Sequence, residues 1–357
     1  MKYLNIGISV LFACLLFGQV QTHLPFQLCQ LEHTNLFLGD WDAFLASLQQ
    51  MGGAVKWLGT YGIQFFDRPI IGGIIFLLPV MGLFATTACV LRRRTKSHWL
   101  WVPLAAWLAV AQLLSLYDFN FYWWGALALC LAMGVLWFWS LLKPSLTRNI
   151  LFAFSIPFIA WLLGAVVLVY VLAGICLFVD KKSWKLAWLV PVTLYIVSVA
   201  FFYVGNRCPS LMVAVSPMMY FEPLLDISYY HLVTWVMTVL VWGGCRWLPM
   251  AQKKVWVWCI CIVSWILPAG VLLQYGGTFR NQSNIDLWRL NHYAYTENWD
   301  GILQFLAGKP MSNYLYMNYA NMALAQQGKL GDWAFSYSPK GMNALLIEAN
   351  STGSIRM

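Results

Sequence analysis

Carboxylate and imidazole side chains, which carry most acid–base and metal chemistry in proteins, number only eighteen in this sequence, and seven of them fall in two short groups. LEHTNLFLGDWD contains the first group and FEPLLDISYYH contains the second. A carboxylate in either stretch has the chemistry of a general base or a metal ligand. The residues concerned are Glu32, His33, Asp40, Asp42, Glu222, Asp226 and His231, and Asp118, which lies between the two stretches, is considered with them.

The first stretch also has a purely structural interpretation. In GDWDAFLASLQQMGG, Asp40 stands where a helix N-cap is expected, and Asp42 falls in the first turn, where a carboxylate offsets the helix dipole. Gly52 and Gly53 would end that helix. Both interpretations stay open. Asp40, Asp42 and Glu32 are therefore the candidate catalytic residues, and whether the protein is an enzyme is left open.

Metal and cofactor sites are not expected. In the second stretch only Glu222 and Asp226 share a helical face, and His231 does not join them. No Walker loop, dinucleotide fingerprint, GxSxG or HExxH motif is present. Seven of the nine cysteines fall inside or at the ends of apolar spans, and only Cys29 and Cys208 lie in the expected outer loops. These two either form a disulfide or remain free thiols.

The elements that must position these residues are apolar. Hydrophobic residues make up 61% of the chain and charged residues 10%, a balance typical of a polytopic α-helical membrane protein. The net charge of +9 comes from short basic runs between apolar spans, so it indicates topology signals among membrane lipids and no nucleic acid. Ionisable groups are nearly absent from the span interiors, which disfavours a pump.

We expect an all-α fold with about eight or nine membrane segments and a small C-terminal helical-repeat domain. Each apolar span but the fifth is close to the ~20 residues that one helix needs to cross a bilayer. The spans are 3–20, 69–91, 99–116, 121–142, 150–179, 186–204, 231–248 and 255–273.

The fifth span is long and is interrupted by Pro157 and Gly164. If it enters and returns as a bent or re-entrant pair, thirteen of the Lys and Arg residues before 280 lie on one side, and only Lys56, Arg68 and Arg207 on the other. A single crossing would divide them evenly, so the positive-inside rule favours the pair. The N-terminus is then cytoplasmic, the first span is an uncleaved signal anchor, and everything after the last span is extracytoplasmic.

These counts divide the chain into a bundle and a tail. Residues 1–274 form the transmembrane bundle, with outer loops at 21–68 and 206–230, the first of them carrying surface helices. A polar linker covers 275–284, and 285–357 has the composition of an ordinary soluble domain.

The tail has an internal period that matches a tetratricopeptide repeat, whose length is about 34 residues. At this offset Trp299 pairs with Trp333, Leu290 with Leu324, and Trp288 with Met322, while Gly328 marks a helix stop. An unrelated helical hairpin is the alternative. Two repeats leave an open end, so the domain is expected to be incomplete and its apolar face to be covered by the bundle or by a partner.

LEHTNLFLGDWDAFLASLQQMGGAVKWLGTYGIQFFDRPIIG, taken with NHYAYTENWDGILQFLAGKP and NYANMALAQQGKLGDWAFSY, resembles a family of uncharacterised bacterial multi-pass membrane proteins. The resemblance implies an inner-membrane bundle joined to an extracytoplasmic tetratricopeptide-like tail, of which this chain is a shortened member. It implies no activity.

Two functions follow as hypotheses. The first is a scaffold or interaction role, in which 285–357 binds a partner protein or a second copy. The second is a glycosyltransferase-like enzyme that acts on a lipid-linked sugar at the outer face, with Asp40 or Asp42 as base.

Overall fold

A computed structural model describes residues 2–94, 101–178, 188–222, 230–244, 270, 282–309, 314–333 and 336. Every regular element among them is a helix, and the only β pairing in these ranges is an isolated bridge between Phe121 and Phe221. The expected all-α class is therefore confirmed for this part of the chain.

The chain folds into two compact units. Unit 1 comprises Met1–Gln21 and Phe37–Phe279, and unit 2 comprises Thr22–Leu36 and Arg280–Met357. A short segment near the N-terminus thus folds with the tail, although the sequence places it in the first outer loop of the bundle.

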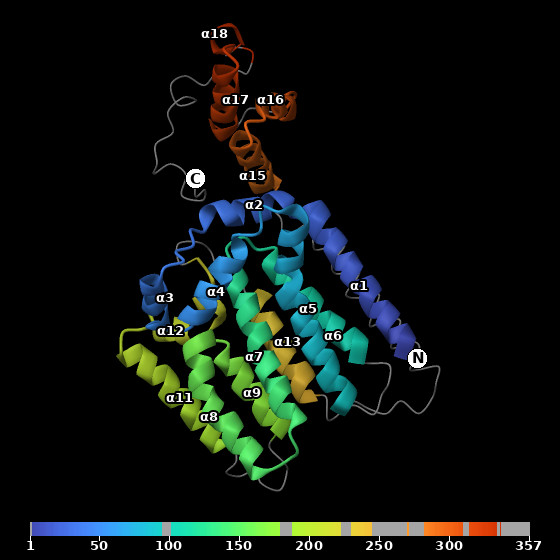
Figure 1. Cartoon of the computed structure of the whole chain (residues 1–357), viewed down its shortest axis with the longest axis vertical. Helices are drawn as coiled ribbons and strands as arrows, with labels where there is room; N and C mark the ends of the chain where they lie inside the picture. The colour runs from blue at the N-terminus through green and yellow to red at the C-terminus, as the bar shows by residue number, and fades with distance from the viewer. Residues whose placement is uncertain are drawn as a thin grey trace. The chain divides into compact units, whose positions relative to one another are not determined.

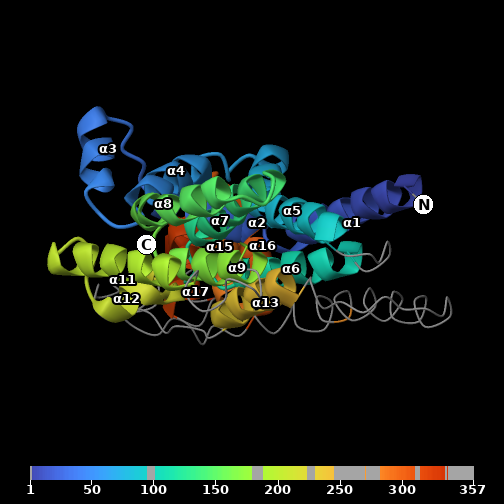
Figure 2. The ribbon, with the colours of Figure 1, turned by 90° about the horizontal axis from the view of Figure 1, so that it is seen from below.

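Unit 1 is a helical bundle that can be followed in Figures 1 and 2. Its described helices are α1 (Lys2–His23), α3 (Trp41–Leu48), α4 (Gly53–Ile63), α5 (Pro69–Arg94), α6 (Trp101–Leu116), α7 (Trp123–Leu141), α8 (Leu146–Leu163), α9 (Val167–Phe178), α11 (Leu189–Val204), α12 (Leu211–Val215), η1 (Pro217–Tyr220) and α13 (Tyr230–Gly244). Helix α5 packs against α6 and α7, and α4 packs against α7 and α8. Helix α13 packs against α9 and α6, and α11 packs against α8.

Small side chains let these helices approach closely. On α7, Ala126, Ala128 and Ala132 are almost completely buried. On α4, a Cβ at Gly59 would lie 2.2 Å from Cβ of Trp124, so only glycine fits there. Close approach through small residues is how apolar helices associate where burial from water cannot drive them together.

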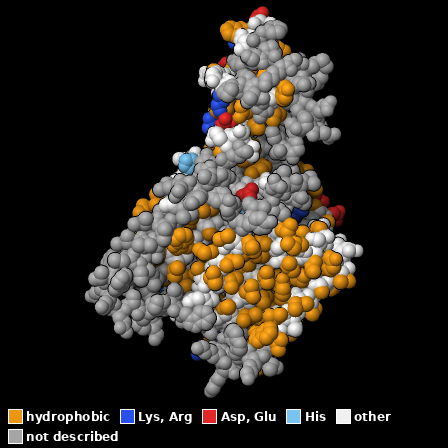
Figure 3. Space-filling view, turned by 180° about the vertical axis from the view of Figure 1, so that it is seen from behind, with side chains coloured by type: hydrophobic (Ala, Val, Ile, Leu, Met, Phe, Trp, Pro, Cys, Tyr) orange, Lys and Arg blue, Asp and Glu red, His pale blue; other side chains and the backbone are white. Residues whose placement is uncertain are grey.

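Four helices of the described chain are long and apolar enough to cross a membrane: Ile6–His23, Pro69–Arg94, Trp123–Leu141 and Leu146–Leu163. Shorter apolar helices occupy four more of the expected spans: Trp101–Leu116, Val167–Phe178, Leu189–Val204 and His231–Gly244. The last expected span, 255–273, lies almost wholly outside the described residues. Hydrophobic side chains dominate the described surface of unit 1 in Figure 3, and together these features indicate a membrane protein.

The long fifth span is an antiparallel pair of helices, as the charge distribution predicted. Helix α8 ends at Leu163 and α9 begins at Val167, and the Phe152 ring packs on the Phe178 ring with centroids 5.3 Å apart. The predicted interruption at Gly164 is confirmed, since its φ is +86°. Pro157 lies inside α8 and does not end it.

Unit 2 consists of α2 (Pro25–Thr34), α15 (Gln282–Tyr295), α16 (Trp299–Leu306), α17 (Tyr314–Gln326) and α18 (Leu330–Trp333). Helices α15, α16 and α17 pack on one another, α2 packs on α15, and α18 on α17. Its core is a single cluster: Leu287, Leu290, Ile302, Leu306, Leu315, Tyr316, Ala320 and Ala323.

Candidate functional site

The candidate carboxylates Asp40 and Asp42 lie at the start of α3. Asp40 is the N-cap, as predicted, and its Oδ2 accepts a hydrogen bond from the Ala43 amide at 3.2 Å. Asp42 is exposed in the first turn. The predicted stop at Gly52 and Gly53 is wrong: α3 ends at Leu48, and Gly52 instead precedes α4 with a φ of +71°.

Glu32 lies in unit 2, not in the bundle. It is on α2, where its Oε2 is 3.3 Å from Nε2 of His33. The His33 ring in turn packs on the Tyr295 ring of α15, with centroids 4.3 Å apart. Glu32 therefore belongs to a different unit from Asp40 and Asp42, which are in unit 1.

The backbone between α8 and α9, from Leu163 to Val166, is held by contacts from several segments of unit 1. We call it the α8–α9 break. Tyr220, which is completely buried, donates a hydrogen bond from its hydroxyl to the Leu163 carbonyl at 2.7 Å and accepts one from the Val166 amide at 3.0 Å. One hydroxyl thus satisfies a carbonyl and an amide that the interrupted helix leaves unpaired.

A second backbone segment packs directly on this break. A Cβ at Gly52 would lie 3.1 Å from Cα of Gly164, and the Gly52 amide donates to the Trp161 carbonyl at 2.8 Å. The Trp161 indole donates to the Leu48 carbonyl at 2.7 Å. The Met51 amide donates to the Arg207 carbonyl at 3.2 Å. The α3–α4 junction, the break and the segment after α11 therefore form one hydrogen-bonded assembly.

A buried histidine in the same unit lies near the carboxylate of Asp118. His231 is 2% exposed, its ring stacks on Phe121 with centroids 3.8 Å apart, and its Nε2 is 3.9 Å from Oδ2 of Asp118. Glu222 accepts a hydrogen bond from the Tyr122 hydroxyl. Among the described residues no group of three metal-binding side chains occurs, and Asp226 lies outside them.

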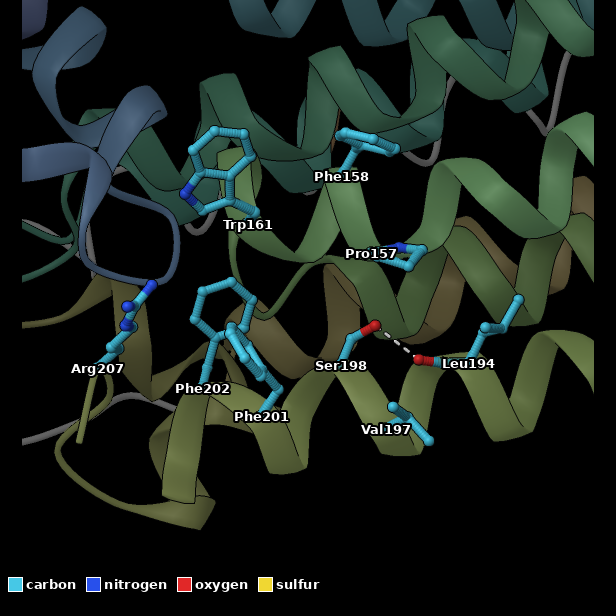
Figure 4. Close-up of a pocket in the computed structure, with 9 residues that line it drawn as sticks. All are labelled: Pro157, Phe158, Trp161, Leu194, Val197, Ser198, Phe201, Phe202 and Arg207. Atoms are coloured by element: carbon cyan, nitrogen blue, oxygen red, sulfur yellow. Dashed lines mark hydrogen bonds between the residues drawn. The ribbon is translucent and has the colours of Figure 1, made fainter. Parts of the chain in front are cut away.

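A pocket lies between α8 and α11. It has a volume of about 330 Å³ and is lined by Pro157, Phe158, Trp161, Leu194, Val197, Ser198, Phe201, Phe202 and Arg207. Figure 4 shows Arg207 at the end near Trp161, with Leu194, Ser198 and Phe202 of α11 directed toward α8. We call this pocket the α8–α11 groove. None of its lining residues carries a carboxylate, and Asp40, Asp42 and Glu32 are not among them.

Unit 2 contains one turn twice, first between α15 and α16 and again between α17 and α18. The Asn298 amide donates to the Tyr293 carbonyl at 2.8 Å, and the Lys329 amide donates to the Leu324 carbonyl at 2.8 Å. The residue before each amide has a positive φ, +55° at Glu297 and +68° at Gly328, as in a Schellman C-cap. Gly328 is thus a helix stop, as predicted.

The next helix begins directly after each turn, at Trp299 in the first copy and at Leu330 in the second. The offset that pairs Trp299 with Trp333 is therefore wrong as a structural register, because Trp299 corresponds to Leu330. Trp299 begins α16, whereas Trp333 is the last residue of α18 and is 56% exposed.

The other residues expected to pack the repeat lie in or near the unit 2 core. Leu290 and Leu324 are buried at 0% and 2% exposure, and Trp299 is half-buried against the core cluster. Trp288 is partly buried on α15. These positions fit a helical stack, and their assignment to a tetratricopeptide repeat stays a prediction.

Two structural features were not predicted from the sequence. Tyr220 follows Pro217 and two Met residues, and nothing in the sequence around it indicates that it serves the α8–α9 break. Helix α2 follows α1 after only Leu24 and was predicted only as part of the outer loop 21–68, although Pro25 was a usable signal of a helix start.

Comparison with known proteins gives a family but no activity. No curated protein and no solved structure matches the chain. One family model matches residues 1–357, and it carries the description of a family of unknown function, DUF6057. Because that match covers the whole chain, the protein belongs to the family of unknown function DUF6057.

Proposed function

We propose that this protein is a membrane-anchored binding protein whose unit 2 takes up a partner protein that presents an apolar helix face. The observation that carries the proposal is a set of exposed aromatic side chains on unit 2. Tyr295 is 72% exposed, Trp333 56% and Tyr314 44%. Large exposed aromatic residues are unusual on a free surface and enriched in protein interfaces.

The way unit 2 is built supports this role. Helix α2 packs on α15, and the Gln30 side chain accepts a hydrogen bond from the Asn291 amide group at 2.8 Å. The Arg289 guanidinium lies between the Phe26 and Phe305 rings, 4.8 and 4.9 Å from their centroids. Among the described residues the stack runs from α2 to α18, and its α17–α18 side is the one that another helical hairpin would extend.

The number and direction of the membrane segments belong to the same proposal. The chain crosses a bacterial inner membrane with eight or nine segments, α1 serves as a signal anchor, and α8 and α9 enter and leave from one face. The N-terminus is cytoplasmic and the tetratricopeptide-like tail is extracytoplasmic. The supporting observation is the concentration of Lys and Arg in the segments that this topology places inside.

The glycosyltransferase hypothesis needs a carboxylate that faces a cavity. Asp40 instead caps α3 and is exposed, and no carboxylate lines the α8–α11 groove. No observation in the described residues favours this second function.

Photocrosslinking in intact membranes tests the binding role. A photoactivatable residue is placed at Trp333 or Tyr314, and the control position is Gln304, which is exposed on α16. We expect one adduct mass from both aromatic positions and none from the control. Crosslinks confined to this chain, or an adduct of twice its mass, would overturn the choice of a different protein as partner.

A further inference from the structure

We propose that the α8–α11 groove is a binding site for one acyl chain of an anionic phospholipid, with Arg207 holding the phosphate of its head group. This goes beyond the binding role of unit 2, because the groove belongs to unit 1 and would select a lipid.

The volume and the lining of the groove suit an apolar chain. Its volume of about 330 Å³ is at the lower end of the range of ligand pockets, and its walls are almost entirely hydrocarbon and aromatic. The Ser198 hydroxyl donates to the Leu194 carbonyl at 2.6 Å, so it offers little polarity to a ligand. An apolar chain is the ligand that such walls accommodate without leaving polar groups unpaired.

The length of the groove along α11 also suits one acyl chain. The lining residues of α11 extend from Leu194 to Phe202, which at 1.5 Å per residue is about 12 Å. The hydrocarbon of one leaflet is about 15 Å thick, half of the ~30 Å core. One acyl chain that runs along α11 would therefore fill the groove, and its head group would lie at the end of the helix.

A positive charge, that of Arg207, lies at the end of the groove near the end of α11. Arg207 follows α11, which ends at Val204, and it is the only charged residue in the lining. Its guanidinium lies over the Phe201 ring, 5.6 Å from the centroid, and forms no ion pair with a described residue. A guanidinium can bind a phosphate through two parallel hydrogen bonds.

Two backbone hydrogen bonds fix the position of Arg207. Its amide donates to the Phe202 carbonyl at 2.9 Å, after Asn206 at a φ of +52°. Its carbonyl accepts from the Met51 amide at 3.2 Å. The guanidinium thus starts from a defined point above the groove, which lowers the entropy lost when it binds a head group.

The test uses the full chain in bilayers that mix phosphatidylglycerol and phosphatidylcholine. The lipids that stay bound after extraction are counted by native mass spectrometry. Arg207→Gln should lower the ratio of bound phosphatidylglycerol to phosphatidylcholine about fivefold, the equivalent of the ~1 kcal/mol expected of one cation at a membrane surface. The matched control is Arg68→Gln, since Arg68 is also exposed and lies over an aromatic ring, 5.7 Å from the Phe65 centroid. It should leave the ratio unchanged.

A second pair of variants tests the acyl chain separately. Val197→Trp fills the groove from its rim, whereas Ile196→Trp adds the same bulk at an exposed position outside it. Val197→Trp should reduce retention of both lipids, and Ile196→Trp should not. An unchanged ratio in Arg207→Gln, an equal loss in Arg68→Gln, or full retention in Val197→Trp would each overturn the proposal.

Discussion

The Tyr220 hydroxyl donates a hydrogen bond to the Leu163 carbonyl at 2.7 Å, which joins the end of α8 to a residue 57 positions further along the chain. The same hydroxyl accepts from the Val166 amide, so it serves both sides of the α8–α9 break. A helix interrupted within an apolar bundle keeps its shape only if such backbone groups find partners.

Tyr220→Phe should therefore destabilise unit 1 by about 2 kcal/mol or more, because a buried carbonyl and a buried amide lose their partner. Hydrogen exchange of the Val166 amide in the full chain measures the loss directly. Tyr195→Phe is the control, since the Tyr195 hydroxyl makes no hydrogen bond with the described residues. Equal effects of the two variants would show that Tyr220 acts only by packing.

Gly164→Ala should destabilise the same break. Gly164 has a φ of +86° and a ψ of −145°, and an added Cβ would lie 2.4 Å from Sδ of Met219. We expect a loss of about 2 kcal/mol, in the range of a residue forced into a sparsely populated backbone region. Gly134→Ala on α7 has open space and should be neutral or stabilise by up to about 1 kcal/mol. Thermal unfolding in one detergent compares the two, and a harmless Gly164→Ala would contradict this account.

The repeated turn of unit 2 predicts opposite effects at its two copies. Gly328→Ala should destabilise unit 2 by about 1 kcal/mol, because alanine is disfavoured at a positive φ. Glu297→Gly should stabilise it by about the same amount, because it relieves that cost at the equivalent position. Hydrogen exchange of peptides from α15 and α17 reports both changes. If both variants destabilise, the two turns are not equivalent.

Unit 2 should lose stability in mild acid. Burial lowers the pKa of His292 below its ordinary value of 6.5, and the nearby His33 lowers it further. The unfolded chain then binds the proton more tightly, so this contribution is complete above pH 6.5 and is lost as the pH falls toward the folded pKa. Exchange protection of α15 should decrease from pH 7.5 to about 5.5 in the wild type, and less steeply in His292→Gln. An identical decrease in both would exclude His292 as the cause.

Helix caps and helix stops were predicted correctly at Asp40 and Gly328 from the residues next to them. The cap at Asp40 and the stop at Gly328 depend on neighbours within a few residues, so the sequence around them is sufficient. The α8–α9 pair was predicted from a different physical constraint, the distribution of Lys and Arg between the two sides of a membrane.

Features that depend on distant contacts were not predictable in this way. Gln30 and Asn291 are separated by 261 positions, so nothing near either residue indicates that α2 folds with α15. The sequence offset aligned Trp299 with Trp333 by residue type, whereas the backbone aligns Trp299 with Leu330 because its turns define the register. The α8–α11 groove is likewise formed by two helices whose apolar sequences resemble every other span.

We propose that α2 completes unit 2 and thereby enables unit 2 to bind a partner. Crosslinking from position 333 should be repeated in Phe26→Ala/Gln30→Ala, which removes the α2 contacts with Arg289, His292, Tyr293 and Asn291. Leu36→Ala is the control, since Leu36 is 82% exposed. We predict that the partner adduct is lost in the double variant and kept in the control. An adduct that persists in the double variant, or that is absent from the wild type, would contradict the claim.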